Sequence, residues 1–137
     1  MNIMTISVAF LIGRLIFGFF WLEAAYKHLF KSAGMVGYAQ SKGIHSAGTA
    51  KFAVFGTGIL ALIGGLSVIL GYRPYYGIAC LVIFLVGVSF IMHAYWKVQD
   101  PMARMTDRIN FTKNMALLGA ALMMLAIQTP WLWSLGW

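Results

Sequence analysis

The residue with the clearest chemical implication is Arg14, because it lies in the middle of a long apolar run from Ile3 to Phe30. A guanidinium at such depth in a bilayer costs about 2.5–3.5 kcal/mol on insertion scales, so it should face protein or trapped water. It also needs a negative or carbonyl partner. Gly18, Trp21 and Ala25 share its face of a helix. This face is therefore the first place to expect a bound ligand or a neighbouring subunit.

A second set of polar side chains falls at the other end of the apolar runs. Glu23 and Lys27 are spaced four apart in the acid-first order that favours pairing on one helix. His93 and Trp96 end the third apolar run, and Asn114 lies near the start of the fourth, at a similar expected depth. Such a set could bind a polar headgroup or pass a proton to it. The alternative interpretation is a self-paired rim with a structural histidine.

The histidines and the cysteine do not have the spacing of a metal or haem site. His28 and His45 lie near the end of the first run and in the connection after it, and Cys80 is the single cysteine. Structural zinc sites and haem ligation need further ligands at fixed offsets. Nucleotide loops, nucleophile elbows and metalloprotease helices have signatures that this sequence lacks. We therefore expect no metal and no covalent cofactor.

Composition identifies the class of protein. Of the 137 residues, 61% are hydrophobic and only 9% are charged, against about 25% charged in soluble proteins. The formal net charge of +7 comes from bases that lie mainly between the apolar runs, without a motif that reads nucleic acid. Membrane lipid is the expected partner of these bases, and nucleic acid is not.

The apolar runs predict an all-α, integral membrane bundle of four helices in a single domain, 1–137. A span of about 20 apolar residues crosses a bilayer, and Asp100 followed by Pro101 is a typical helix start. Three tryptophans in the tail favour the headgroup level. The expected elements are spans at about 3–30, 51–70, 75–96 and 111–128, a short interfacial helix within 36–42, and an interfacial tail at 129–137.

The basic residues predict the orientation. With four spans, the first and third connections share one face of the membrane, and both termini share the other. Arg73 is the base of the short second connection. The positive-inside rule places the long connections in the cytoplasm and both termini on the non-cytoplasmic side. The bases of the long connections are Lys31, Lys42, Lys51, Lys97, Arg104, Arg108 and Lys113.

Several stretches resemble the DoxX-like family of small membrane proteins, and together they cover nearly the whole chain. They occur in the family's order and spacing. The matching residues are Gly13-Arg14-Leu15 with Gly18, Gly37-Tyr38 with Lys42-Gly43-Ile44, Gly64-Gly65 with Leu70-Gly71, His93 with Tyr95-Trp96, and the stretch 111–119 that opens the fourth span.

The resemblance implies a four-helix protein of the cytoplasmic (inner) membrane of a bacterium or archaeon. Some members of the family are associated with quinone-linked oxidation of sulfur compounds or with redox-stress complexes. Many members carry a glutamate where this chain has Ala61. Counting residues along the helices places Ala61 and Arg14 at nearly the same depth, close to the midplane. We therefore expect the partner of Arg14 to be a quinone oxygen, a lipid phosphate or an acid of another subunit, all outside this chain, with backbone carbonyls as the alternative.

Three functions remain open at this point. The first is a membrane subunit of a redox assembly, an oxidoreductase complex subunit that binds quinone or a similar lipophile between its helices. The second is an accessory subunit that packs beside a larger complex and does no chemistry. The third is a small transporter, although broken helices and inverted repeats, which are typical of transporters, are not evident. Other membrane or soluble subunits, or further copies of this chain, are expected partners.

Overall fold

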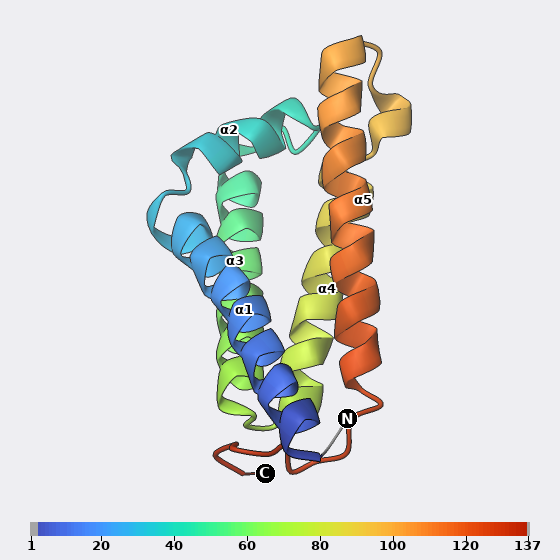
Figure 1. Ribbon diagram of the computed structural model, residues 1–137. Helices are drawn as coiled ribbons and strands as arrows, with labels where there is room; N and C mark the ends of the chain where they lie inside the picture. Colours follow the sequence, from blue (N-terminus) through green and yellow to red (C-terminus); the bar gives the residue numbers. More distant parts are fainter. Residues whose placement is uncertain (1–2, 137) are drawn as a thin grey trace.

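The computed structural model describes residues 3–136, and every regular element in that range is helical. Figure 1 shows the long helices side by side, with a short helix lying across one end of the bundle and the two ends of the chain at the other. The all-helical fold is thus confirmed. The elements are α1 (Ile3–Phe30), α2 (Ala33–Ser41), α3 (Ala47–Leu70), α4 (Pro74–Met92), the 3-10 turn η1 (Tyr95–Lys97) and α5 (Pro101–Met124).

Three of the long helices are long and apolar enough to cross a membrane: Met4–Phe30, Ala47–Leu70 and Pro74–Lys97. The fourth, α5, runs beside α4, and its first turns rise beyond the rest of the bundle in Figure 1. Its first half is polar, and only the stretch from Phe111 onward is mainly apolar. The expected span at 111–128 therefore corresponds to the second half of α5, which starts before residue 111, at Pro101, and ends before residue 128, at Met124.

Local capping explains where the helices begin and end. The Asp100 side chain accepts a hydrogen bond from Ala103 N at 2.8 Å, and Pro101 occupies the first turn, so α5 starts there. Ser46 caps α3 in the same way, so this helix begins at Ala47, four residues before the predicted start at Lys51. At the end of α4, His93 N bonds to Val88 O, and the chain turns away before the predicted end at Trp96.

Paired glycines on α3 set its spacing from α1 and from α4. A Cβ on Gly65 would lie 3.0 Å from the backbone oxygen of Gly18 on α1. A Cβ on the adjacent Gly64 would lie 2.2 Å from the side chain of Leu81 on α4. The two glycines therefore lie on different faces of α3, which lets both neighbouring helices approach closely. This is the small-residue packing that membrane helices use in place of a hydrophobic driving force.

The core contains large apolar side chains from all four long helices and from the tail, while many other large apolar side chains face outward. Outward apolar side chains suit a protein that is solvated by lipid. On α5 the buried positions recur every seven residues, so one stripe of that helix faces α4. The buried residues of this stripe are Asp107, Asn114 and Ala121.

Candidate functional site

Arg14 is 1% exposed, and backbone carbonyls of this chain accept all of its recorded hydrogen bonds. Its Nε donates to Val68 O at 3.1 Å, and its Nη2 donates to Ile69 O at 2.7 Å. Its Nη1 donates to Leu132 O in the tail at 2.8 Å. The expectation that the partner of Arg14 lies outside the chain is therefore wrong.

These contacts make Arg14 the cap of helix α3. The last carbonyls of a helix lack partners within it and carry partial negative charge, which a cation stabilises. Val68 and Ile69 belong to that last turn, and Leu135 N of the tail donates to the next carbonyl, Leu70 O, at 2.9 Å. The guanidinium thus lies at the end of α3 rather than near the midplane, because a long side chain on a helix points toward the helix N-terminus.

Ala61 does not lie beside Arg14, contrary to the count along the helices. Because α1 and α3 are antiparallel and meet at Gly18 and Gly65, residues further along α1 meet earlier residues of α3. Ala61 is two turns, or about 10 Å, before Val68 on α3. It is fully buried in the same core cluster as Trp21. An acid at position 61 could therefore not replace the carbonyl partners of Arg14 in this packing.

The tail also differs from the prediction. Trp131 is 3% exposed, and its ring lies 5.1 Å from that of Phe10 and 5.4 Å from the Arg14 guanidinium. It is therefore part of the core, not an interfacial anchor. Trp133 is exposed, as an anchor would be. Trp137, the third tryptophan of the predicted anchor, lies outside the described residues.

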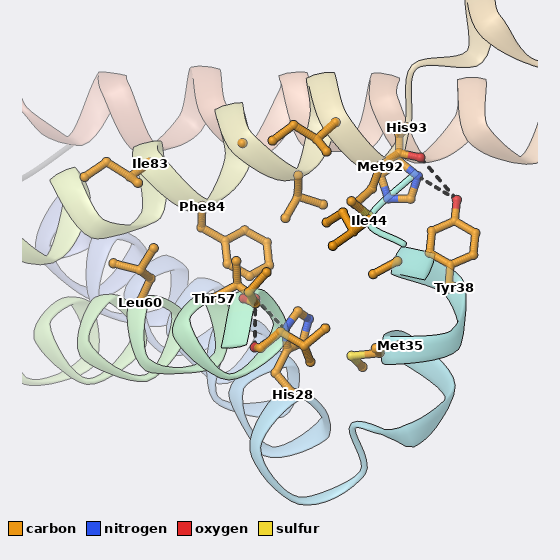
Figure 2. A pocket seen from close by; sticks show the side chains of 16 residues that line it. His28, Met35, Tyr38, Ile44, Thr57, Leu60, Ile83, Phe84, Met92 and His93 are labelled. Atoms are coloured by element: carbon orange, nitrogen blue, oxygen red, sulfur yellow. Dashed lines mark hydrogen bonds between the residues drawn. The ribbon is translucent and has the colours of Figure 1, made fainter. Parts of the chain in front are cut away.

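A cavity of about 380 Å³ lies at the other end of the bundle, between α1, α2, α3 and α4. Figure 2 shows side chains from these elements around it. Its volume is in the range of small-molecule sites, which are mostly apolar with a few polar groups. Ile83 and Ile91, on its α4 side, are 61% and 57% exposed, so the cavity opens sideways along that helix.

One polar group of the cavity is a pair between α1 and α3. His28 Nδ1 lies 2.9 Å from Thr57 Oγ1 and 3.2 Å from Val54 O. The Thr57 hydroxyl also lies 2.9 Å from the carbonyl oxygens of Ala53 and Val54 on its own helix. Gly58 makes room for this contact, because a Cβ there would lie 2.9 Å from His28 Cβ. The pair brings an imidazole to the wall of an apolar cavity.

The other polar group is centred on Asp107, which is 2% exposed on α5. Tyr38 of α2 donates its hydroxyl proton to Asp107 Oδ1 at 2.6 Å, and His93 Nδ1 lies 3.1 Å from the same oxygen. Lys42, which follows α2, forms an ion pair with Oδ2. Tyr38 and His93 also line the cavity. One carboxylate therefore links α2, the end of α4 and α5 beside the cavity mouth.

The charge state of this cluster follows from its contacts. Burial raises the pKa of Asp107, but hydrogen bonds from Lys42, Tyr38 and His93 together with the charge of Lys42 outweigh it, so the pKa lies below the usual value. Burial, the hydrogen bond to Asp107 and its negative charge all raise the pKa of Tyr38. Asp107 is thus a carboxylate and Tyr38 a neutral phenol at neutral pH.

Comparison with known proteins adds one finding. The model of the DoxX family matches residues 9–94, which is more than half of the chain. This protein belongs to the DoxX family. Neither a curated protein nor a solved structure matches it. The matched region of this DoxX protein contains Arg14, Tyr38, Lys42 and His93, whereas Asp107 lies beyond it.

The DoxX protein brings together only part of the predicted polar set. Glu23 and Lys27 pair at 2.6 Å, and both are well exposed, as the rim interpretation expected. The acid that His93 contacts is Asp107, not Glu23. Trp96 is exposed and packs in an aromatic cluster with Phe90, Tyr95 and Phe111, and Asn114 is buried on the inner stripe of α5.

Asp107, Tyr38 and His28 are site residues that the sequence patterns did not predict. Asp107 lies seven residues before Asn114, and a polar pair at that spacing shares one helical face. Trp21, which the sequence did single out, is 1% exposed, and its Nε1 has no hydrogen-bond partner within residues 3–136.

Proposed function

We propose that this DoxX protein is the membrane subunit of a redox assembly and binds a quinone or a similar lipophile in the cavity between α1, α2, α3 and α4. The observation that carries the proposal is the cavity itself, about 380 Å³ in volume and lined mainly by apolar side chains. A quinone head group is a flat, mostly apolar ring with two oxygens. It needs such a cavity with a polar group near each end.

The arrangement of the lining supports this ligand class. His28 and Thr57 lie on the α1 and α3 side, and Tyr38 with His93 lies on the α2 and α4 side. Phe84 on α4 supplies an aromatic surface beside His28, and the two ring centroids are 5.5 Å apart. The opening along Ile83 and Ile91 suits a ligand whose apolar tail stays among the lipids. The ligand could then enter from the bilayer without any break in a helix.

The same proposal gives the protein a place in the cell. The bases gather at the α2 end, so we place this end in the cytoplasm of a prokaryote and both termini outside its inner membrane. The quinone would carry the electrons, and a separate membrane or soluble subunit would exchange them with it. The bases at the α2 end provide a surface for such a subunit.

The test is a binding titration with the protein in lipid nanodiscs, using a short-chain ubiquinone analogue and calorimetry. Gly87 lines the cavity, and a Cβ there meets nothing within 4 Å, so Gly87→Leu should fill the cavity without straining the backbone. We expect it to weaken binding by at least about tenfold, since the leucine occupies the ligand's volume. Gly119 on α5 is equally free of contacts and lies outside this cavity, so Gly119→Leu is the matched control.

Two results would refute the proposal. One is the absence of saturable binding of the analogue to the unaltered protein in both its oxidised and its reduced form. The other is equal affinity in Gly87→Leu and the unaltered protein, which would place the ligand elsewhere on the surface.

A further inference from the structure

The hydrogen-bonding character of the cavity depends on where the two imidazole protons lie. A neutral imidazole has one donor nitrogen and one acceptor nitrogen, and the partner of one nitrogen decides the role of the other. Both His28 and His93 use Nδ1 for their recorded contacts. Within residues 3–136, Nε2 of either ring has no recorded partner. The role of each Nε2 therefore follows from the contacts of Nδ1.

The contacts of His28 assign the proton to Nδ1. The Val54 carbonyl oxygen, 3.2 Å away, can only accept. Thr57 has its own acceptors in the carbonyls of Ala53 and Val54, so its oxygen is free to accept from the imidazole. The opposite tautomer would place the Nδ1 lone pair against the Val54 oxygen. In the neutral ring, Nε2 of His28 is therefore an acceptor.

Acidic residues that could hold a charged imidazole at His28 are absent from its surroundings. The chain has only three acids. Glu23 pairs with Lys27, Asp100 caps α5, and Asp107 pairs with Lys42. A cation in apolar surroundings without a counter-charge is costly, so the neutral ring is the form that this position favours.

The Asp107 cluster gives the second acceptor position in the same way. Asp107 Oδ1 is a carboxylate oxygen, so His93 Nδ1 and the Tyr38 hydroxyl must both donate to it. Lys42 already balances the charge of Asp107 through Oδ2. Nε2 of the neutral His93 ring is then an acceptor, while the Tyr38 oxygen already has His93 Nδ1 at 3.4 Å. The polar groups at both ends of the cavity are thus suited to a ligand that donates hydrogen bonds.

We propose that the cavity binds the reduced, dihydroxy form of a quinone-type ligand in preference to the oxidised form. This inference rests on the proposed function and specifies its ligand. A hydroquinone presents two O–H donors, whereas a quinone presents two carbonyl oxygens, which only accept. Acceptors facing acceptors are left unpaired in a closed site, and sites built to bond a hydroxyl reject analogues that lack it. The cavity is therefore a quinol site.

The experiment compares three ligands of nearly equal shape by calorimetry on the unaltered protein in nanodiscs at pH 7.5. They are a short-chain ubiquinone analogue, its quinol kept reduced under argon, and the dimethyl ether of that quinol, which has no donor. We expect the quinol to bind at least about tenfold more tightly than the quinone, with the dimethyl ether as weak as the quinone or weaker. The ether separates hydrogen-bond donation from ring shape.

A pair of variants assigns the preference to the cavity. His28→Phe keeps the ring and removes the acceptor, and Thr57 keeps its backbone acceptors, so the fold should persist. It should lower the ratio of quinol affinity to quinone affinity about fivefold. Met35→Leu changes an apolar lining residue and should leave the quinol to quinone ratio unchanged.

The outcomes separate the two proposals. Equal or tighter binding of the quinone, or a dimethyl ether that binds as tightly as the quinol, would overturn the preference and leave the proposed function standing. A quinol to quinone ratio that His28→Phe does not lower would also overturn the preference. Binding of none of the three ligands would overturn the proposed function and the preference together.

Discussion

Replacing Arg14 by glutamine should destabilise this DoxX protein strongly and release its tail. Three charge-assisted hydrogen bonds, at 2.7–3.1 Å, would be lost or weakened. Each is worth about 1.5–3 kcal/mol, but glutamine can replace one of them and water can reach the tail carbonyl, so we expect a net loss of about 3–5 kcal/mol. Arg14→Lys keeps the charge without the planar fork and should lose less.

The assay combines thermal unfolding in detergent with limited proteolysis of the tail. Leu132 and Leu135 hold the tail to Arg14 and to the end of α3, so Arg14→Gln should expose residues 125–136 to protease well below the unfolding temperature. Arg104→Gln removes an exposed arginine and is the matched control. An unchanged unfolding temperature and an unchanged cleavage rate in Arg14→Gln would refute the capping role.

Three further predictions concern other parts of the bundle. Asp107→Asn should cost roughly 2 kcal/mol, because it leaves Lys42 without its counter-charge while Lys42 stays partly exposed. Because the pKa of Asp107 is depressed, its stabilisation of the unaltered protein is present above about pH 4 and is lost as the pH falls through the lowered pKa. Unfolding measured at a series of pH values should show this dependence in the unaltered protein and not in Asp107→Asn. Gly65→Val should destabilise by about 1–3 kcal/mol or more in the same unfolding assay, because its side chain would meet the α1 backbone, and an unchanged unfolding temperature would contradict the close crossing. Glu23→Gln should leave the unfolding temperature unchanged, since its pair with Lys27 is exposed, and a clear drop would show that the pair is structural.

The sequence predicted the helices because their signals are local. A long apolar run specifies a spanning helix wherever it occurs. Asp100 and Pro101 specify the start of α5 through a cap that reaches only three residues along the chain, to Ala103. The observed helix ends differ from the predicted ones where the local signal was weaker. This holds at Ser46, which precedes α3, and at His93, whose backbone N–H donates to the carbonyl oxygen five residues earlier.

The partners of Arg14 could not be read from the sequence. They are carbonyl groups 54, 55 and 118 residues away, and every residue has a carbonyl, so no side-chain type marks them. The count along the helices also assumed that the charge lies at the depth of its own Cα. A side chain as long as arginine can instead reach the end of a neighbouring helix.

The two ends of the bundle are therefore held by different means. At the end with the termini, Arg14 and the tail close α3 through carbonyls that do not titrate. At the other end, α2 has only nine residues, which is too short for a stable isolated helix in water. Its links to α5 are Tyr38 and Lys42, and both reach the single carboxylate of Asp107. The cover of the cavity thus depends on a carboxylate that titrates, whereas the Arg14 cap at the other end depends on carbonyls that do not.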